Sequence, residues 1–152
     1  SSISVFDNSW HLIGFSFNGG TLKLYIDGVE DTTVATTKDG AVPTMFDSSN
    51  NITIAASSSG GSQAEFYLGY LDEIAFYRSS LNVGHINTVY NSGVPIDLVT
   101  TGPAAGQLDM WWRMGDDSGD DIGTTNTITE LRNAHHGSVL NMSSADIENI
   151  AP

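Results

Sequence analysis

The adjacent carboxylates Asp72 and Glu73 are the first residues to test for chemistry, because two acids facing one cleft can hydrolyse a glycosidic bond. That reaction needs both acids on the same face, about 5–5.5 Å apart in a retaining enzyme. Residues 71–77 are predicted to be a strand, in which neighbouring side chains point to opposite faces and Ile74, not an acid, shares the face of Asp72. We therefore expect no catalysis, and we interpret Asp72 as a structural acceptor for loop amides.

A second acidic group, at 116–121, has the residue types that could hold a cation. Asp116, Asp117 and Asp120 supply three carboxylates within a short loop, and Ca²⁺ prefers several oxygen ligands from flexible backbone. The spacing does not match an EF-hand loop, because its glycine would fall at Asp121 and Ser118 is a weak third ligand. Two interpretations stay open, a calcium site and a solvated acidic turn, and no other cofactor is expected.

Candidate ligand-binding residues are an aromatic and basic pair and the tips of loops. Trp10 and Trp112 occupy positions expected to face the core, whereas Trp111 is expected to point outward beside Arg113. The other candidates lie on predicted loops at strand ends: Asp47, Ser58 and Ser59. The neighbouring His135 and His136 are not expected to bind metal, because neighbours on a strand diverge.

The elements that must position these residues are clearest at 10–28. Apolar residues alternate on both sides of Asn18-Gly19, a pair that accepts the positive φ of a tight hairpin turn, and Asp27-Gly28 repeats that chemistry. In the strand at 21–26, the alternation puts one face in the core and the other in solvent. The apolar face carries Leu22, Leu24 and Ile26; the other carries Thr21, Lys23 and Tyr25.

Further elements follow from the same patterns. Residues 51–56, 65–70 and 71–77 read as strands, and residues 57–62 read as a flexible loop. Asn82 is a suitable N-cap for a helix over about 83–91, with Gly93 suited to the left-handed position after it.

These residues resemble a known family. Trp10-His11 opening a strand, followed by Leu-Tyr-Ile-Asp-Gly at 24–28, is similar to the central hairpin of laminin-G-like domains of the concanavalin A-like lectin/glucanase superfamily. The run from Gly69 to Tyr77 and the helix ending at 90–93 resemble the closing strand and helix of those domains. The resemblance implies an all-β fold, an antiparallel β-sandwich of the jelly-roll, concanavalin A-like type, with one short helix near residues 83–91. Such domains often bind calcium, although their ligand loops do not align here.

The resemblance also predicts a domain organisation for the chain. Residues 1–98 are expected to form the laminin-G-like unit without its opening strands, and 99–107 a linker. Residues 108–152 are expected to form a C-terminal β segment that completes the sandwich, either of its own domain or of a neighbouring copy in a strand-exchanged oligomer. In the family an aromatic strand pairs beside the closing strand, so Trp112 and Met110 are expected to pack against Ile74 and Phe76. The C-terminal part also resembles segments of virion proteins of marine bacteriophages.

Composition limits the partners. A net charge of −13, from 5 Lys and Arg against 18 Asp and Glu, disfavours nucleic acid and anionic surfaces. No apolar run is long enough to insert into a membrane. We expect a non-enzymatic structural or adhesion module on a virion surface or in an extracellular setting. Its expected partners are other copies or subunits of that assembly and a host-surface glycan, neutral or basic because the net charge opposes anionic polymers. A secreted bacterial carbohydrate-binding domain is the alternative, and a degenerate glycoside hydrolase is the outside option.

Overall fold

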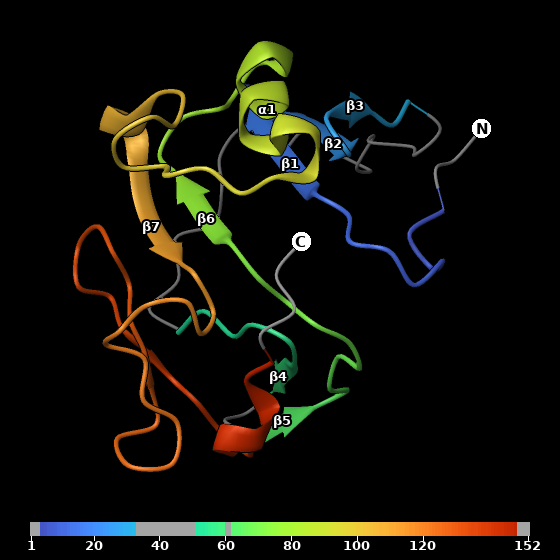
Figure 1. Cartoon of the computed structure of the whole chain (residues 1–152). Coiled ribbons are helices and arrows are strands. Elements are labelled where there is room, and N and C mark those ends of the chain that lie inside the picture. Colours follow the sequence, from blue (N-terminus) through green and yellow to red (C-terminus); the bar gives the residue numbers. More distant parts are fainter. Residues whose placement is uncertain (1–3, 33–50, 60–61, 149–152) are drawn as a thin grey trace.

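The structure is a computed structural model that describes residues 4–32, 51–59 and 62–148. Within these ranges the strands pair in four small antiparallel sheets, ordered β1-β2-β3, β4-β5, β6-β7 and β8-β9. The elements (Figure 1) are β1 Ile13–Asn18, β2 Thr21–Ile26, β3 Val29–Glu30, β4 Ser57–Ser59, β5 Ser62–Ala64, β6 Ile74–Tyr77, α1 Val83–Tyr90, β7 Leu108–Trp112, β8 Thr127–Ile128 and β9 Gly137–Ser138, with short 3₁₀ turns at Asn91–Gly93, Ala105–Gln107 and Ser144–Asp146. A mostly antiparallel β architecture with one short helix is confirmed. No helix in the described ranges is long and apolar enough to cross a bilayer.

The predicted hairpin at 10–28 is confirmed. β1 and β2 pair from Ile13↔Ile26 to Asn18↔Thr21, so Gly19 and Gly20 are the central turn residues, with φ of 55° and 87°. Asp27 and Gly28, also at positive φ, connect β2 to β3. Positive φ at both central positions gives the turn the twist of its strands, which is why these residue types mark the corners.

The burial of the two faces of this sheet differs from the prediction that the apolar face lies in the core and the other in solvent. Tyr25, on the face with the polar residues, is 2% exposed, whereas Phe15, on the apolar face, is 71% exposed. Helix α1 lies over the sheet (Figure 1) and packs on the Tyr25 side, because Gly14, directly opposite Tyr25, faces the Ile86 side chain. The assignment of the whole apolar face to the core is therefore wrong for its exposed part, which includes Leu22, although Ile26 at the strand end is buried.

Helix α1 begins and ends with the expected chemistry. The Asn82 side chain accepts a hydrogen bond from the His85 N–H at 2.9 Å, as an N-cap does. The helix ends at Tyr90, and Asn91 takes the left-handed C-cap position at φ 41°. The residue expected there, Gly93, has φ 83° and follows one short turn later.

The predicted pairing of the aromatic strand with the closing strand is observed. β7 lies antiparallel to β6, with Ile74 opposite Trp112 and Phe76 opposite Met110. The Phe76 and Trp112 rings meet edge to face at 6.1 Å, and Trp112 anchors a buried cluster that the chain completes with Ile122 and Ile128. Burial of large apolar side chains is the main stabilising term, so this cluster holds the C-terminal segment to β6.

The predicted strands at 51–56 and 65–70 are not present. The paired strands are β4, which lies in the segment 57–62 expected to be a flexible loop, and β5, which begins at the last residue of that segment. A single backbone hydrogen bond, from the Tyr67 N–H to the Ala55 carbonyl at 2.8 Å, links the flanking segments. The backbone turns at Ala55 and Glu65, which have φ of 65° and 51°. Alternation in sequence does not identify a pairing partner, because pairing depends on contacts distant in sequence.

Candidate functional site

Two hollows among the described residues are lined by residues that the sequence singled out. The larger, which we call the groove, has a volume of about 1170 Å³ and runs between the segments at 51–56, 66–72 and 137–142. The smaller, which we call the pocket, has a volume of about 220 Å³ and is lined by Glu73, Trp111, Arg113 and Leu131 with residues 95–97. A groove of this size can hold several rings of an extended ligand.

Aromatic side chains border the groove. Trp10 and Tyr70 lie with ring centroids 6.4 Å apart, tilted by 47°, and both contact solvent. Phe66 and Tyr67 line the same groove and are more than half exposed. Exposed rings beside a hollow offer apolar faces to a ligand without a rearrangement of the core.

The expectation that Trp10 belongs to the core is wrong, since it is 38% exposed. β1 begins only at Ile13, so the strand alternation used to place Trp10 does not extend to it. Its ring lies against Tyr70, a residue sixty positions away.

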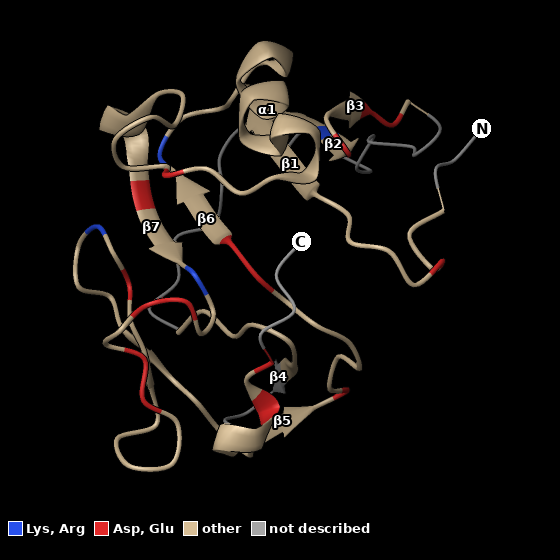
Figure 2. Ribbon diagram, in the orientation of Figure 1, with Lys and Arg blue, Asp and Glu red and all other residues tan. Residues whose placement is uncertain are grey.

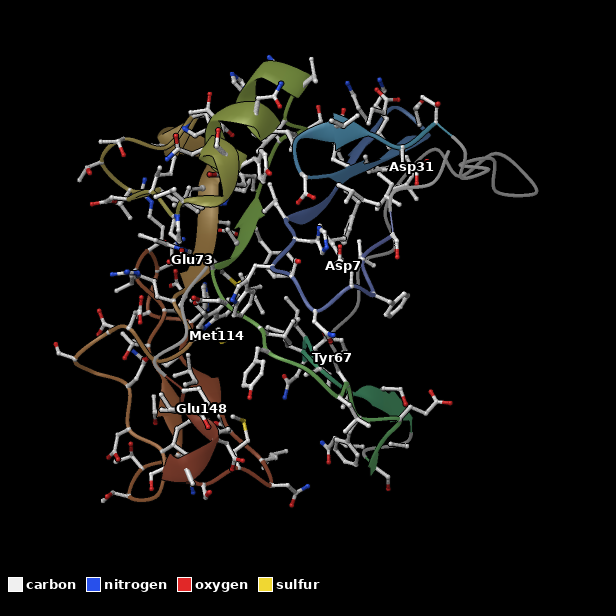
Figure 3. All side chains as sticks on the ribbon, turned by 45° about the vertical axis from the view of Figure 1, so that its right-hand side comes forward. Asp7, Asp31, Tyr67, Glu73, Met114 and Glu148 are labelled. Atoms are coloured by element: carbon white, nitrogen blue, oxygen red, sulfur yellow. The ribbon has the colours of Figure 1, made fainter. Side chains whose placement is uncertain are left out.

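The position of Tyr67 depends on Gly69. A Cβ at Gly69 would lie 2.7 Å from the Tyr67 hydroxyl and 2.8 Å from two ring carbons. Figure 3 shows Tyr67 on one side of the hollow, with Met114 and Glu148 on the other. The glycine thus lets the ring fold against the backbone where it borders the groove.

The polar lining of the groove includes four carboxylates, together with the imidazoles of His135 and His136. Its carboxylates are Asp72, Asp116, Asp146 and Glu148, and no Lys or Arg lies among the described residues that line it. Figure 2 shows acidic segments along the loops that follow β7. Burial raises the pKa of Asp72 to about 6, against the backbone N–H of Glu73, which lowers it. The nearby charges of Glu73 and Asp116 add to the rise.

The pocket contains a hydrogen-bonded set centred on Glu73. The Trp111 indole N–H donates to Glu73 Oε2 at 2.6 Å, and Arg113 Nε donates to Glu73 Oε1 at 3.2 Å. Arg113 also pairs with Asp116 at 3.1 Å and lies 5.7 Å from the centre of the Trp111 ring. Glu73 itself has φ of 52°, an uncommon backbone for glutamate that the surrounding contacts hold in place.

The expectation that Trp111 points to the surface is wrong, although Arg113 lies beside it as expected. Trp111 is 4% exposed and packs with Leu98 and Leu108 in a second core cluster. The face of β7 opposite Trp112 is covered by residues 96–99 and 131, so both faces of this strand are buried. Alternation shows that Trp111 and Trp112 point apart, but it does not show that either face is open.

The two adjacent acids face different hollows. Asp72 lines the groove and Glu73 lines the pocket, as expected for neighbours that project apart. Asp72 accepts a hydrogen bond from the Glu73 N–H at 2.8 Å, while the Glu73 carboxylate is occupied by Trp111 and Arg113.

The carboxylates of the acidic loop at 116–121 form hydrogen bonds and an ion pair with nearby groups of the protein itself. Asp117 accepts from the Gly119 N–H at 2.8 Å, Asp120 accepts from the Gly115 N–H at 2.8 Å, and Asp116 pairs with Arg113. Within the described residues no group of three or more His, Asp or Glu side chains is placed to hold a metal ion. The three carboxylates proposed for calcium are therefore not brought together.

The remaining predicted binding residues are placed only in part. Ser58 and Ser59 lie in β4, and their side chains, like the whole of Asp47, are outside what the structure describes. The structure brings together Trp111 and Arg113. Asp116 lines the groove and pairs with Arg113, which lines the pocket. The groove aromatics at 66–70 were missed, although a run of three aromatic residues in five positions is a signal that sequence reasoning could have used.

One family model matches the chain, and its description is the concanavalin A-like lectin/glucanases superfamily. The match covers residues 1–87, more than half of the 152 residues, and includes the groove aromatics but not β7. The chain belongs to this laminin G family. No curated protein matches the chain. No solved structure matches it either.

Proposed function

We propose that this protein is a non-enzymatic adhesion module that binds glycans in the groove. The observation that carries the proposal is a large open hollow bordered by exposed aromatic rings, in a chain whose superfamily contains lectins. Sugar rings present C–H faces that stack on aromatic side chains, while their hydroxyls bond to polar groups at the rim. Asn51, Gln63 and Asn141 supply such groups at the groove.

The absence of hydrolysis is part of the proposal. Glycosidases need two carboxyl groups directed into one cleft, at a separation of about 5–10 Å. Of the two adjacent acids, only Asp72 faces the groove. The Glu73 side chain lies in the pocket, where it accepts a hydrogen bond from Trp111. The adjacent pair therefore does not supply the two carboxyl groups in one cleft that retention or inversion requires.

The module is proposed to act within a larger assembly, a virion surface or fibre or, alternatively, a secreted bacterial adhesin. The support is the exposed apolar face of β1 and β2, where Ile13, Phe15 and Leu22 contact solvent. Such a face suits a second sheet packed on it, which would complete the β-sandwich typical of the family.

Binding is tested with a glycan array followed by titration calorimetry on each positive glycan. Tyr70→Ala should weaken binding about tenfold or more, because loss of one stacked ring removes on the order of 1.4 kcal/mol. Phe15→Ala is the matched control, since Phe15 is an exposed aromatic residue outside the groove. An array without positive glycans, or equal losses in the two variants, would refute the proposal.

Hydrolysis is tested separately on the same glycans. Product should remain at background in the unaltered protein and in Asp72→Asn. Turnover that disappears in Asp72→Asn would contradict the non-enzymatic assignment.

A further inference from the structure

The charge of the groove sets the class of glycan it can accept. Four carboxylates line it, with no lining Lys or Arg among the described residues. Two of the four already have partners, since Asp116 pairs with Arg113 and Asp146 accepts from the Ser143 N–H and hydroxyl. Asp72 accepts a hydrogen bond from the Glu73 N–H, and neither Asp72 nor Glu148 forms an ion pair with the basic residues that the structure describes.

The Lys and Arg residues that the structure describes lie outside the groove lining. Lys23 pairs with Glu30, Arg78 with Asp109, and Arg113 with Glu73 and Asp116. Arg132 does not line the groove either, and Lys38 lies outside the described residues. The whole chain carries −13. Field lines concentrate in a hollow with low-dielectric walls, so the potential in the groove attracts cations and repels anions.

Aromatic rings and carboxylates in one groove match a specific ligand chemistry. The apolar face of a sugar stacks on Trp10 and Tyr70, and an ammonium on the sugar pairs with a carboxylate and with the negative faces of neighbouring rings. We infer that the groove selects glycans built from amino sugars with free amines over their N-acetylated or anionic counterparts. The inference rests on the proposed function, because it concerns the same groove and names its ligand class.

The test compares two oligosaccharides of the same length and linkage, hexamers of glucosamine and of N-acetylglucosamine, by calorimetry with the full chain at neutral pH. The amine form should bind about tenfold more tightly, from one or two partly screened charge contacts and a cation–π contact. The ratio should fall toward one as salt rises from about 0.05 to 0.5 M, because screening shortens the reach of these charges. A heparin-type polymer should not bind.

Variants locate the effect. The double change Asp72→Asn with Glu148→Gln should reduce the preference for the amine to about threefold or less and leave the N-acetyl hexamer within about twofold. Glu65→Gln is the control, because Glu65 is an exposed acid outside the groove lining. Spermine tests whether charge alone suffices, and it should bind at least tenfold more weakly than the amine hexamer.

Each outcome decides the question. Equal affinity for the two hexamers, spermine binding as tightly as the sugar, or an equal effect of Glu65→Gln would overturn amine selection while leaving glycan binding intact. Binding of neither hexamer, together with a negative array, would instead remove the proposed function itself. A preference that is salt-sensitive and lost only in the double variant supports the inference.

Discussion

Glu130 is the residue whose replacement tests the structure most sharply. It is 3% exposed, and each of its carboxylate oxygens accepts two backbone N–H groups. Oε1 accepts from Trp111 at 2.8 Å and Arg132 at 2.7 Å, and Oε2 from Asn133 at 2.6 Å and His135 at 3.2 Å. One side chain thus fastens the 130–135 turn to β7.

Glu130→Gln keeps the shape of the side chain but replaces one of the two acceptor oxygens with an NH₂ group, which is a donor. Whichever way the amide is oriented, its NH₂ faces two backbone donors that lose their partner. Hydrogen bonds to a charged group contribute about 1.5–3 kcal/mol each, so the variant should lose about 3–6 kcal/mol of unfolding free energy. For a domain of this size that lowers Tm by about 6 °C or more.

The assay is urea and thermal unfolding followed by circular dichroism, with Glu65→Gln as the exposed control. Burial favours the protonated form of Glu130, yet the four N–H donors together hold its pKa below its usual value. The Glu130 contribution should therefore be complete above the unfolded pKa, about 4.3, and disappear as pH falls through the lower folded pKa. A loss below about 1 kcal/mol, or the same loss in both variants, would show that the carboxylate does not anchor this turn.

Three further predictions concern other parts of the chain. Trp111→Ala and Trp112→Ala should each cost about 3–5 kcal/mol in chemical denaturation, since both indoles are buried, and a much smaller cost for Trp111 would contradict its burial. Gly28→Ala should destabilise more than Gly19→Ala in thermal melts, because both residues have positive φ but only Gly28 meets α1, and equal costs would show that the helix does not press on this turn. Hydrogen bonds to Asp27, the larger cause, and to Asp7 raise the pKa of His11. The contribution of His11 to the free energy of unfolding should therefore be full below about pH 6.5 and lost as pH rises through the raised pKa. A pH titration of stability that is identical in His11→Gln would refute the last point.

The local elements of this chain were predictable because local chemistry decides them. Glycine at positive φ marks the β1–β2 turn, and Asn82 supplies an acceptor for the free N–H groups that every helix start exposes. The β6–β7 pairing was also predictable, since the resemblance to the family places an aromatic strand beside the closing strand. The charge of the groove walls follows from a composition with few basic residues to distribute.

Which faces are covered, and which side chains meet, was decided only by the tertiary structure. Alternation separates Trp111 from Trp112 and Tyr25 from Leu24, but it cannot state that a helix covers the Tyr25 face or that residues near Leu98 cover Trp111. The groove is formed by segments as distant as Trp10 and Glu148. Sequence periodicity reports the direction of a side chain relative to its own backbone, whereas burial and proximity depend on contacts between segments far apart in the chain.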